Sequence, residues 1–231
     1  MKTNGISHFI EHMVFKGTTN RSVKDIARSI ESVGGYLNAF TGKEHTCYYA
    51  RVLDEHTELA VDVLSDLVLN ATLPAKDLEK EKGVVIEELK NAEDDPDDII
   101  HDYFDKALFG SHPLGYPVIG TESNLRSFTR DDLLKYIGKH YLPNRMVLAA
   151  AGNVSHDKLV ALAEKHFGST RKRSHAAGAE RKKPQLYHPE KKDFKKPIQQ
   201  AHICIGAQAW SIKSKHRYPT LVLNTLLGDG M

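Results

Sequence analysis

A short polar segment near the start of the chain, His8-Phe9-Ile10-Glu11-His12, interrupts an apolar pattern with the period of a helix. Apolar residues recur at i, i+3, i+4, i+7 and i+8, which is the spacing of one buried stripe: Ile6, Phe9, Ile10, Met13 and Val14. At 100° per residue, His8, Glu11 and His12 fall on the opposite side. The fold must therefore bury one face of this helix and keep three ionisable groups together on the other.

These three groups predict a metal site. Two imidazoles at i and i+4 lie one helical turn apart and can hold one tetrahedral Zn²⁺ from the same face. The carboxylate of Glu11, next to the second histidine, can take a proton from metal-bound water. The order H-x-x-E-H is the inverted form of a zinc-binding motif. Since the chain has 13 histidines, the alternative is a solvated polar face that carries two of them by chance. A metal site needs a third ligand.

The third ligand is expected in a helix predicted from Ala75 to about Ala92. Its buried stripe comprises Leu78, Val85, Ile86 and Leu89, and helical phase puts Glu81 and Glu88 along the edge of this stripe, with Glu87 facing solvent. A carboxylate at the rim of an apolar stripe needs a counter-charge or a metal, because burying it unpaired costs several kcal/mol. We therefore predict Glu88 as the ligand and Glu81 as a supporting carboxylate. The alternative is that both are ion-paired glutamates on a helix rich in Lys and Glu.

Composition excludes several other classes of protein. The 231 residues are 40% hydrophobic and 27% charged, with a formal net charge of +2, which is typical of a globular chain with no strong attraction to nucleic acid or membrane. No apolar run is long enough to span a bilayer, and no secretory signal precedes the His8 helix. Cys47 and Cys204 lie in apolar runs and are interpreted as buried thiols. We expect a cytoplasmic protein.

Strand and helix patterns alternate along the chain and predict an α+β fold. Strands are expected at Tyr36–Thr41 and His45–Val52, joined by a turn at Gly42–Glu44, and again at Met146–Ala151 and His202–Ala207. Helical patterns lie between and after them, each with apolar residues at helical spacing: 23–33, 55–70, 75–92, 98–109, 130–141, 159–167 and 218–227. Residues 171–196 are polar and basic, without interleaved aromatics, and are predicted to be a linker between a zinc-binding domain (1–170) and a second domain that begins at 197.

The assembled pattern resembles the pitrilysin family of zinc peptidases, the group of insulin-degrading enzyme and mitochondrial processing peptidase, and most closely its shorter bacterial branch. That family pairs H-x-x-E-H with a distal Glu at the separation of Glu88, and with a further Glu seven residues earlier, here Glu81. The similarity in sequence continues through five further segments: Gly34–Thr41, Glu44–Tyr49, His112–Gly115, Tyr141–Asn144 and Gly152–Asn153.

The resemblance implies roles for individual residues. His8, His12 and Glu88 are expected to bind one Zn²⁺, Glu11 to act as general base, and Glu81 to support the metal-bound water. The strand containing Asn38, Ala39, Phe40 and Thr41 is expected to be the edge along which an extended peptide lies. The implied activity is that of a zinc metalloendopeptidase acting on peptides or unfolded segments.

The resemblance also implies a mixed, largely antiparallel sheet covered by helices on one side. Family members have a strand before the His8 helix and a second, similar half, so we expect this chain to be a fragment and the intact protein to be a homodimer or to pair with a related subunit. One alternative is a non-catalytic subunit that binds peptides or a partner, but the intact His8, Glu11, His12 and Glu88 disfavour it. Another is a truncated product that does not fold stably.

Overall fold

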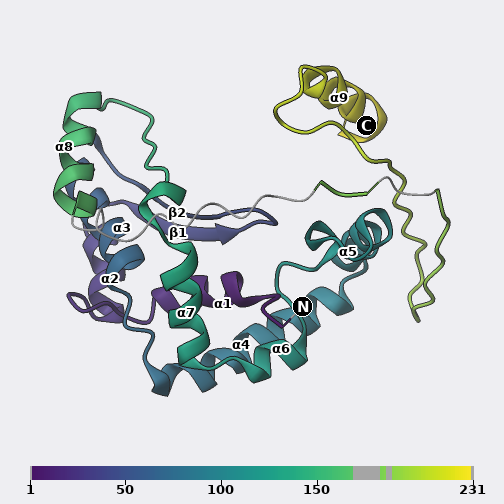
Figure 1. Ribbon diagram of the computed structural model, residues 1–231, viewed down its shortest axis with the longest axis horizontal. Coiled ribbons are helices and arrows are strands. Elements are labelled where there is room, and N and C mark those ends of the chain that lie inside the picture. The colour runs from purple at the N-terminus through teal and green to yellow at the C-terminus, as the bar shows by residue number, and fades with distance from the viewer. Residues whose placement is uncertain (1, 169–182, 186–188, 230–231) are drawn as a thin grey trace. The chain divides into compact units, whose positions relative to one another are not determined.

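The computed structural model describes residues 2–168, 183–185 and 189–229 (Figure 1). The described residues form two compact units, one from Met1–Asp94 and Pro117–Arg181, the other from Asp95–Tyr116 and Lys182–Met231. The predicted linker at 171–196 lies largely outside the described residues, and the predicted domain division stays a prediction.

The first unit contains most of the regular structure. Its strands are β1 (Tyr36–Thr41) and β2 (Thr46–Arg51), and its helices are α1 (Ile6–Val14), α2 (Val23–Glu31), α3 (Thr57–Asn70), α4 (Ala75–Asp94), α6 (Glu122–Ser127), α7 (Arg130–His140) and α8 (His156–Phe167). The second unit contains α5 (Pro96–Phe109) and α9 (Arg217–Asn224), which continues as a π-helical turn at Thr225–Asp229. Every predicted helix is present, with ends within a few residues of those expected. Only α6 was not anticipated.

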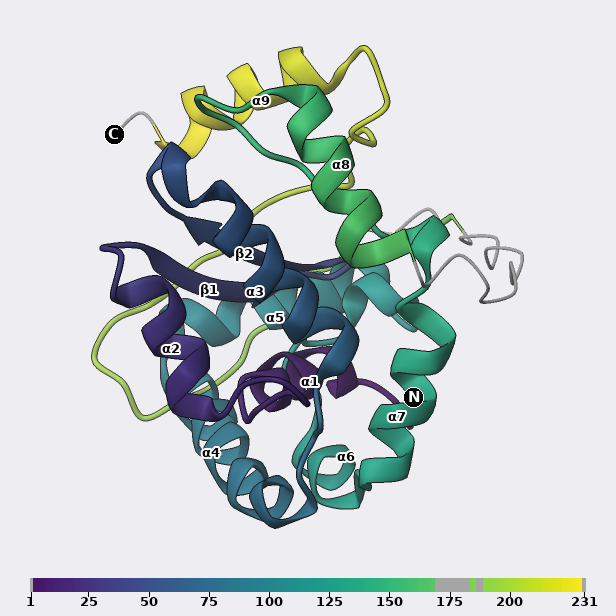
Figure 2. The same ribbon diagram turned by 90° about the vertical axis from the view of Figure 1, so that its left-hand side faces the viewer.

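Helix α1 lies between β1 and α4 (Figures 1 and 2) and contacts both. All five residues of its predicted stripe are buried, and they pack against the buried stripe of α4 and against Leu125, Phe128 and Leu133. Burying a side chain of this size contributes about 1.5–3 kcal/mol. The polar face of α1 is therefore held in place by the largest apolar cluster among the described residues.

Strands β1 and β2 form the expected antiparallel hairpin, with a register that runs from Tyr36 opposite Arg51 to Thr41 opposite Thr46. A second apolar cluster lies where α2 and α3 pack against this hairpin, and it consists of Ile26, Ile30, Ala60, Val63 and Leu67. Helix α2 begins at a capping box, in which Ser22 accepts from the Asp25 amide and the Asp25 carboxylate accepts from the Ser22 amide.

A buried carboxylate, Asp66 of α3, fastens the loop between α1 and α2. Only 3% of Asp66 is exposed. Its Oδ2 accepts from the Thr18 hydroxyl (2.6 Å) and Arg21 Nη1 (2.8 Å), and its Oδ1 accepts from Asn20 Nδ2 (2.6 Å) and Asn70 Nδ2 (2.8 Å). Four donors satisfy the charge, so the loop that leaves α1 is tied to α3 by a complete polar network.

Two glycines set where α1 begins. Gly5, the N-cap residue, and Gly120 both have φ of +92°, and their backbones touch: a Cβ on Gly120 would lie 2.7 Å from both the Asn4 oxygen and Gly5 Cα. A side chain fits neither the conformation nor the space.

We expect Gly120→Ala to lower the free energy of unfolding by more than about 1 kcal/mol. Gly83→Ala is the matched control, because Gly83 lies in the interior of α4 with nothing within 4 Å of an added Cβ. It should raise stability by up to about 1 kcal/mol. Urea midpoints of the two variants measure the difference, and shifts of the same sign would contradict this account of the contact.

Two predicted strands are absent. Residues 146–151 and 202–207 form no ladder, and β1 and β2 make up the sheet of the described residues. Val147 is 91% exposed, Ile203 79% and Ile205 91%. The apolar pattern that predicted these strands is present, but a strand also needs a neighbour to accept its hydrogen bonds, and no described residues provide one.

No helix in the described part of the chain is both long and apolar enough to cross a membrane.

Candidate metal centre

The polar face of α1 meets the edge of α4 at a cluster of three possible metal ligands. One ligand atom from each of His8, His12 and Glu88 lies within 4.8 Å of the others, and no other such group occurs among the described residues. His12 Nε2 is 3.3 Å and His8 Nε2 is 4.0 Å from Glu88 Oε2, and the two imidazole centroids are 4.7 Å apart. Each imidazole side chain is 19% exposed and the Glu88 carboxylate 43%.

The environment of His8 keeps its imidazole neutral at neutral pH. Burial, and secondarily the neighbouring His12, lower the pKa of His8 from 6.5 to about 4. Nδ1 of His8 is buried without a hydrogen-bond partner among the described residues, whereas Nε2 faces Glu88. A neutral imidazole has the free lone pair that a metal ligand requires.

The second imidazole is oriented by a carboxylate. Glu81 Oε1 lies 3.0 Å from His12 Nδ1, and Glu81 Oε2 accepts from Lys16 Nζ at 2.7 Å. Only 4% of Glu81 is exposed. Because Nδ1 faces the carboxylate, Nε2 of His12 is directed toward Glu88. Glu81 thus contacts an imidazole and a lysine, while Glu87 is exposed as predicted.

Glu11 projects from α1 toward the hairpin. Its Oε2 accepts a hydrogen bond from the hydroxyl of Thr41, at the end of β1, and the Thr41 hydroxyl is 3.2 Å from that of Thr46 on β2. This carboxylate is therefore held by a neutral donor and comes from the same helix as the two imidazoles.

Two partly buried tyrosines lie near Glu11. The hydroxyl of Tyr48 on β2 is 2.9 Å from that of Tyr141, which follows α7. Burial raises the pKa of both phenols, and the charge of Glu11 raises both further. Both are neutral at neutral pH and so can donate hydrogen bonds near the carboxylate.

The predicted peptide edge is β1, which pairs with β2 along one side. No described strand pairs with its other side. The amide of Ala39 donates to Asn38 Oδ1 (2.8 Å) instead of to β2, and the Phe40 side chain is 48% exposed. Asn38, Ala39 and Phe40 are thus accessible, whereas the Thr41 hydroxyl is engaged with Glu11.

Sequence reasoning missed Lys16, Tyr48 and Tyr141. Lys16 carries a recognisable signal, because it follows His12 by four residues and so faces the same side of the chain as it leaves α1. The tyrosines carry none, since their proximity depends on how α7 and β2 meet.

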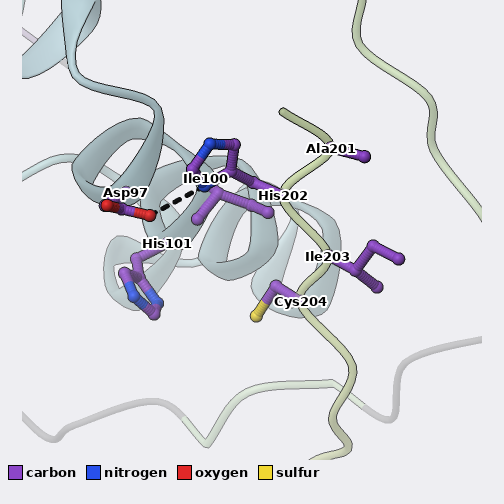
Figure 3. A pocket seen from close by; sticks show the side chains of 7 residues that line it. All are labelled: Asp97, Ile100, His101, Ala201, His202, Ile203 and Cys204. Atoms are coloured by element: carbon purple, nitrogen blue, oxygen red, sulfur yellow. Dashed lines mark hydrogen bonds and ion pairs between the residues drawn. The ribbon is translucent and has the colours of Figure 1, made fainter. Parts of the chain in front are cut away.

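A separate cavity of about 520 Å³ lies in the second unit, lined by Asp97, Ile100, His101 and Ala201–Cys204 (Figure 3). His202 Nδ1 is 2.7 Å from Asp97 Oδ1. The cavity includes Cys204, whose pKa is raised by burial, so its thiol is protonated at neutral pH. Cys47 and Cys204 are both free, as predicted, but half-buried instead of buried.

Comparison with known proteins assigns the chain to a family. A profile described as Insulinase (Peptidase family M16) matches residues 1–122, which include all the predicted site residues, and one described as Peptidase M16 inactive domain matches residues 127–231. The chain belongs to peptidase family M16. The resemblance stated from the sequence is confirmed.

Relatives within the M16 family are named zinc proteases. The chain is 49% identical over 228 residues to "Uncharacterized zinc protease YmxG" of Bacillus subtilis, covering 99% of the chain and 55% of that protein. It is 45% identical over 229 residues to "Uncharacterized zinc protease ML0855" of Mycobacterium leprae, covering 98% and 52%. The chain thus spans about half the length of these relatives.

Solved structures share the fold. A protease from Helicobacter pylori is 24% identical with a TM-score of 0.73, covering 82% of this chain and 45% of that one. An M16 inactive domain from Pseudomonas fluorescens is 20% identical with a TM-score of 0.72, covering 80% and 45%. The predicted α+β fold class is confirmed, with two antiparallel strands among the described residues.

Proposed function

We propose that this chain carries the zinc centre of a metalloendopeptidase, with His8, His12 and Glu88 as ligands and Glu11 as general base. The observation that carries the proposal is the convergence of three ligand atoms within 4.8 Å beside a carboxylate from the same helix. The zinc protease names of the M16 relatives support the same activity.

The donor set fits zinc. Two nitrogens and one carboxylate oxygen leave a fourth tetrahedral position open, as catalytic zinc sites require. His12 has the outer carboxylate partner that zinc-binding histidines usually have, and His8 is neutral. His12 Nε2 and Glu88 Oε2, at 3.3 Å, are already at about the spacing of two ligands on one tetrahedral ion.

In this proposal each residue of the site has a separate chemical role. Zinc, when bound, supplies a Lewis acid that polarises a carbonyl and acidifies water. Glu11 takes the proton from the attacking water and returns it to the leaving amine. Thr41 holds the Glu11 carboxylate in position through its hydroxyl. Glu81 orients His12, and this contact defines the supporting role that we assign to it.

The substrate in this proposal is a peptide or an unfolded segment. The open side of β1 at Asn38, Ala39 and Phe40 has backbone groups that an extended peptide can pair with. Pairing through the backbone recognises peptides with little regard to sequence, so the side chains beside the edge would set any preference. A cytoplasmic location and a homodimeric or paired intact protein stay predictions.

Zinc content tests the centre. Elemental analysis of the purified chain should find about one zinc, and His8→Ala and Glu88→Gln should each lose it, because each removes one of three protein ligands. Glu87→Gln is the matched control, since Glu87 is the exposed neighbour of Glu88 on α4 and should keep the metal. Zinc retained in Glu88→Gln would show that another group is the third ligand. A folded wild-type chain without zinc would refute the proposal.

A further inference from the structure

We infer that Lys16 is a positioning residue of the metal centre, which acts through Glu81 to fix the imidazole of His12. This inference rests on the proposed function. The inference extends the proposed function by naming a residue that contacts neither the metal nor the substrate.

The contacts form an unbroken series. Lys16 Nζ donates to Glu81 Oε2 at 2.7 Å, and the other oxygen of the same carboxylate is 3.0 Å from His12 Nδ1. On the far side of the ring, His12 Nε2 is 3.3 Å from Glu88 Oε2. Each carboxylate oxygen of Glu81 thus serves one partner, and the orientation of the imidazole depends on the carboxylate staying where it is.

The burial of Glu81 makes Lys16 necessary. The Glu81 side chain is 5% exposed, whereas Lys16 is 30% exposed and reaches in from the rim. A buried carboxylate without a counter-charge costs several kcal/mol. Lys16 is the one lysine or arginine paired with Glu81 among the described residues. Without it, the carboxylate is expected to turn toward water and leave His12 Nδ1 without an acceptor.

The loss of metal affinity on removing a residue that supports a metal ligand has a known size. Removing a group that orients a metal-bound histidine typically costs 10–100-fold in metal affinity. A loss of zinc affinity in the folded protein, in addition to any loss of stability, separates this role from that of an ordinary ion pair. Lys82 is the natural comparison, because it pairs with Glu79 at 2.8 Å, is 11% exposed, and donates its other hydrogen bond to the Arg126 oxygen at 3.1 Å.

The test is the zinc dissociation constant of the full chain, measured by competition with a chromophoric chelator. We expect Lys16→Met to bind zinc at least tenfold more weakly than wild type, Lys16→Arg to stay within about threefold, and Lys82→Met to match wild type. Circular dichroism of the metal-free proteins verifies that each is folded.

A double variant keeps the inference testable if Lys16→Met does not fold. Glu81→Gln removes the carboxylate charge, so Lys16→Met should weaken zinc binding no further in that background. Wild-type affinity in Lys16→Met, or an additional loss in the double variant, would overturn the inference and leave the proposed function intact. A wild-type chain that binds no zinc would instead refute the proposed function.

Discussion

Replacing Glu11 by glutamine is expected to lower kcat for peptide hydrolysis at least about hundredfold while one zinc per chain is retained. Glutamine keeps the shape of the side chain and can still accept the Thr41 hydrogen bond, but it cannot take a proton from water. Because Glu11 is not among the three grouped ligand atoms, the metal should stay. The loss should therefore appear in kcat, with little change in KM.

The measurement is steady-state cleavage of a fluorogenic peptide by the zinc-loaded chain, with elemental analysis of the same samples. Glu87→Gln, an exposed change of the same kind, should leave the rate unchanged. Thr41→Val should fall between wild type and Glu11→Gln, and Thr41→Ser should recover most of the rate, because serine restores the hydroxyl. Wild-type activity in Glu11→Gln would exclude Glu11 as the base.

The largest expected effect on stability comes from Asp66→Ala, which should lower the free energy of unfolding by about 3 kcal/mol or more. The change leaves four donors without their acceptor. Among the residues that the structure describes, the Arg21 guanidinium would keep Asp62 as its one ion-pair partner. The urea midpoint measures the loss. Glu58→Ala is the control: its pair with Lys165 is more than half exposed on both sides, so the change should cost less than about 1 kcal/mol.

The same carboxylate gives stability a dependence on acid pH. Burial alone raises the pKa of Asp66, but the hydrogen bonds from Thr18, Asn70, Arg21 and Asn20 outweigh it and lower the pKa below 3.8. A carboxyl whose pKa is lower in the folded state contributes stability above its unfolded pKa and loses it as the pH falls through the folded value. The midpoints of wild type and Asp66→Ala should therefore converge as the pH falls below about 4. A constant difference from pH 7 to pH 2 would contradict this account.

Local sequence patterns were enough to predict the helices and the hairpin, because these elements are determined by residues that are close in sequence. The helical stripe of α1, the Ser22 cap and the Gly42–Glu44 turn each depend on residues close in sequence. Helical phase was also enough to distinguish Glu88 from Glu87, since burial on α4 follows the angle around the helix axis.

Contacts between distant segments were beyond such reasoning. The apolar runs at 146–151 and 202–207 look like strands by composition, yet strand formation depends on a neighbour that sequence patterns do not name. The side chain of Thr41 was expected along a peptide edge, but its hydroxyl meets Glu11, a contact set by how α1 approaches the end of β1. Lys16, the partner of Glu81, is different, because its spacing of four residues from His12 was a signal in the sequence.

The unequal exposure of the three grouped side chains has a consequence for how quickly a metal could enter and leave. His8 and His12 start from one helix whose other face is buried, so few torsions remain to be ordered when they bind an ion. Glu88 is more than twice as exposed and has more rotatable bonds. A metal ion should therefore bind first to the two imidazoles. The rate at which the Glu88 carboxylate dissociates from the ion should then set how long the ion stays bound.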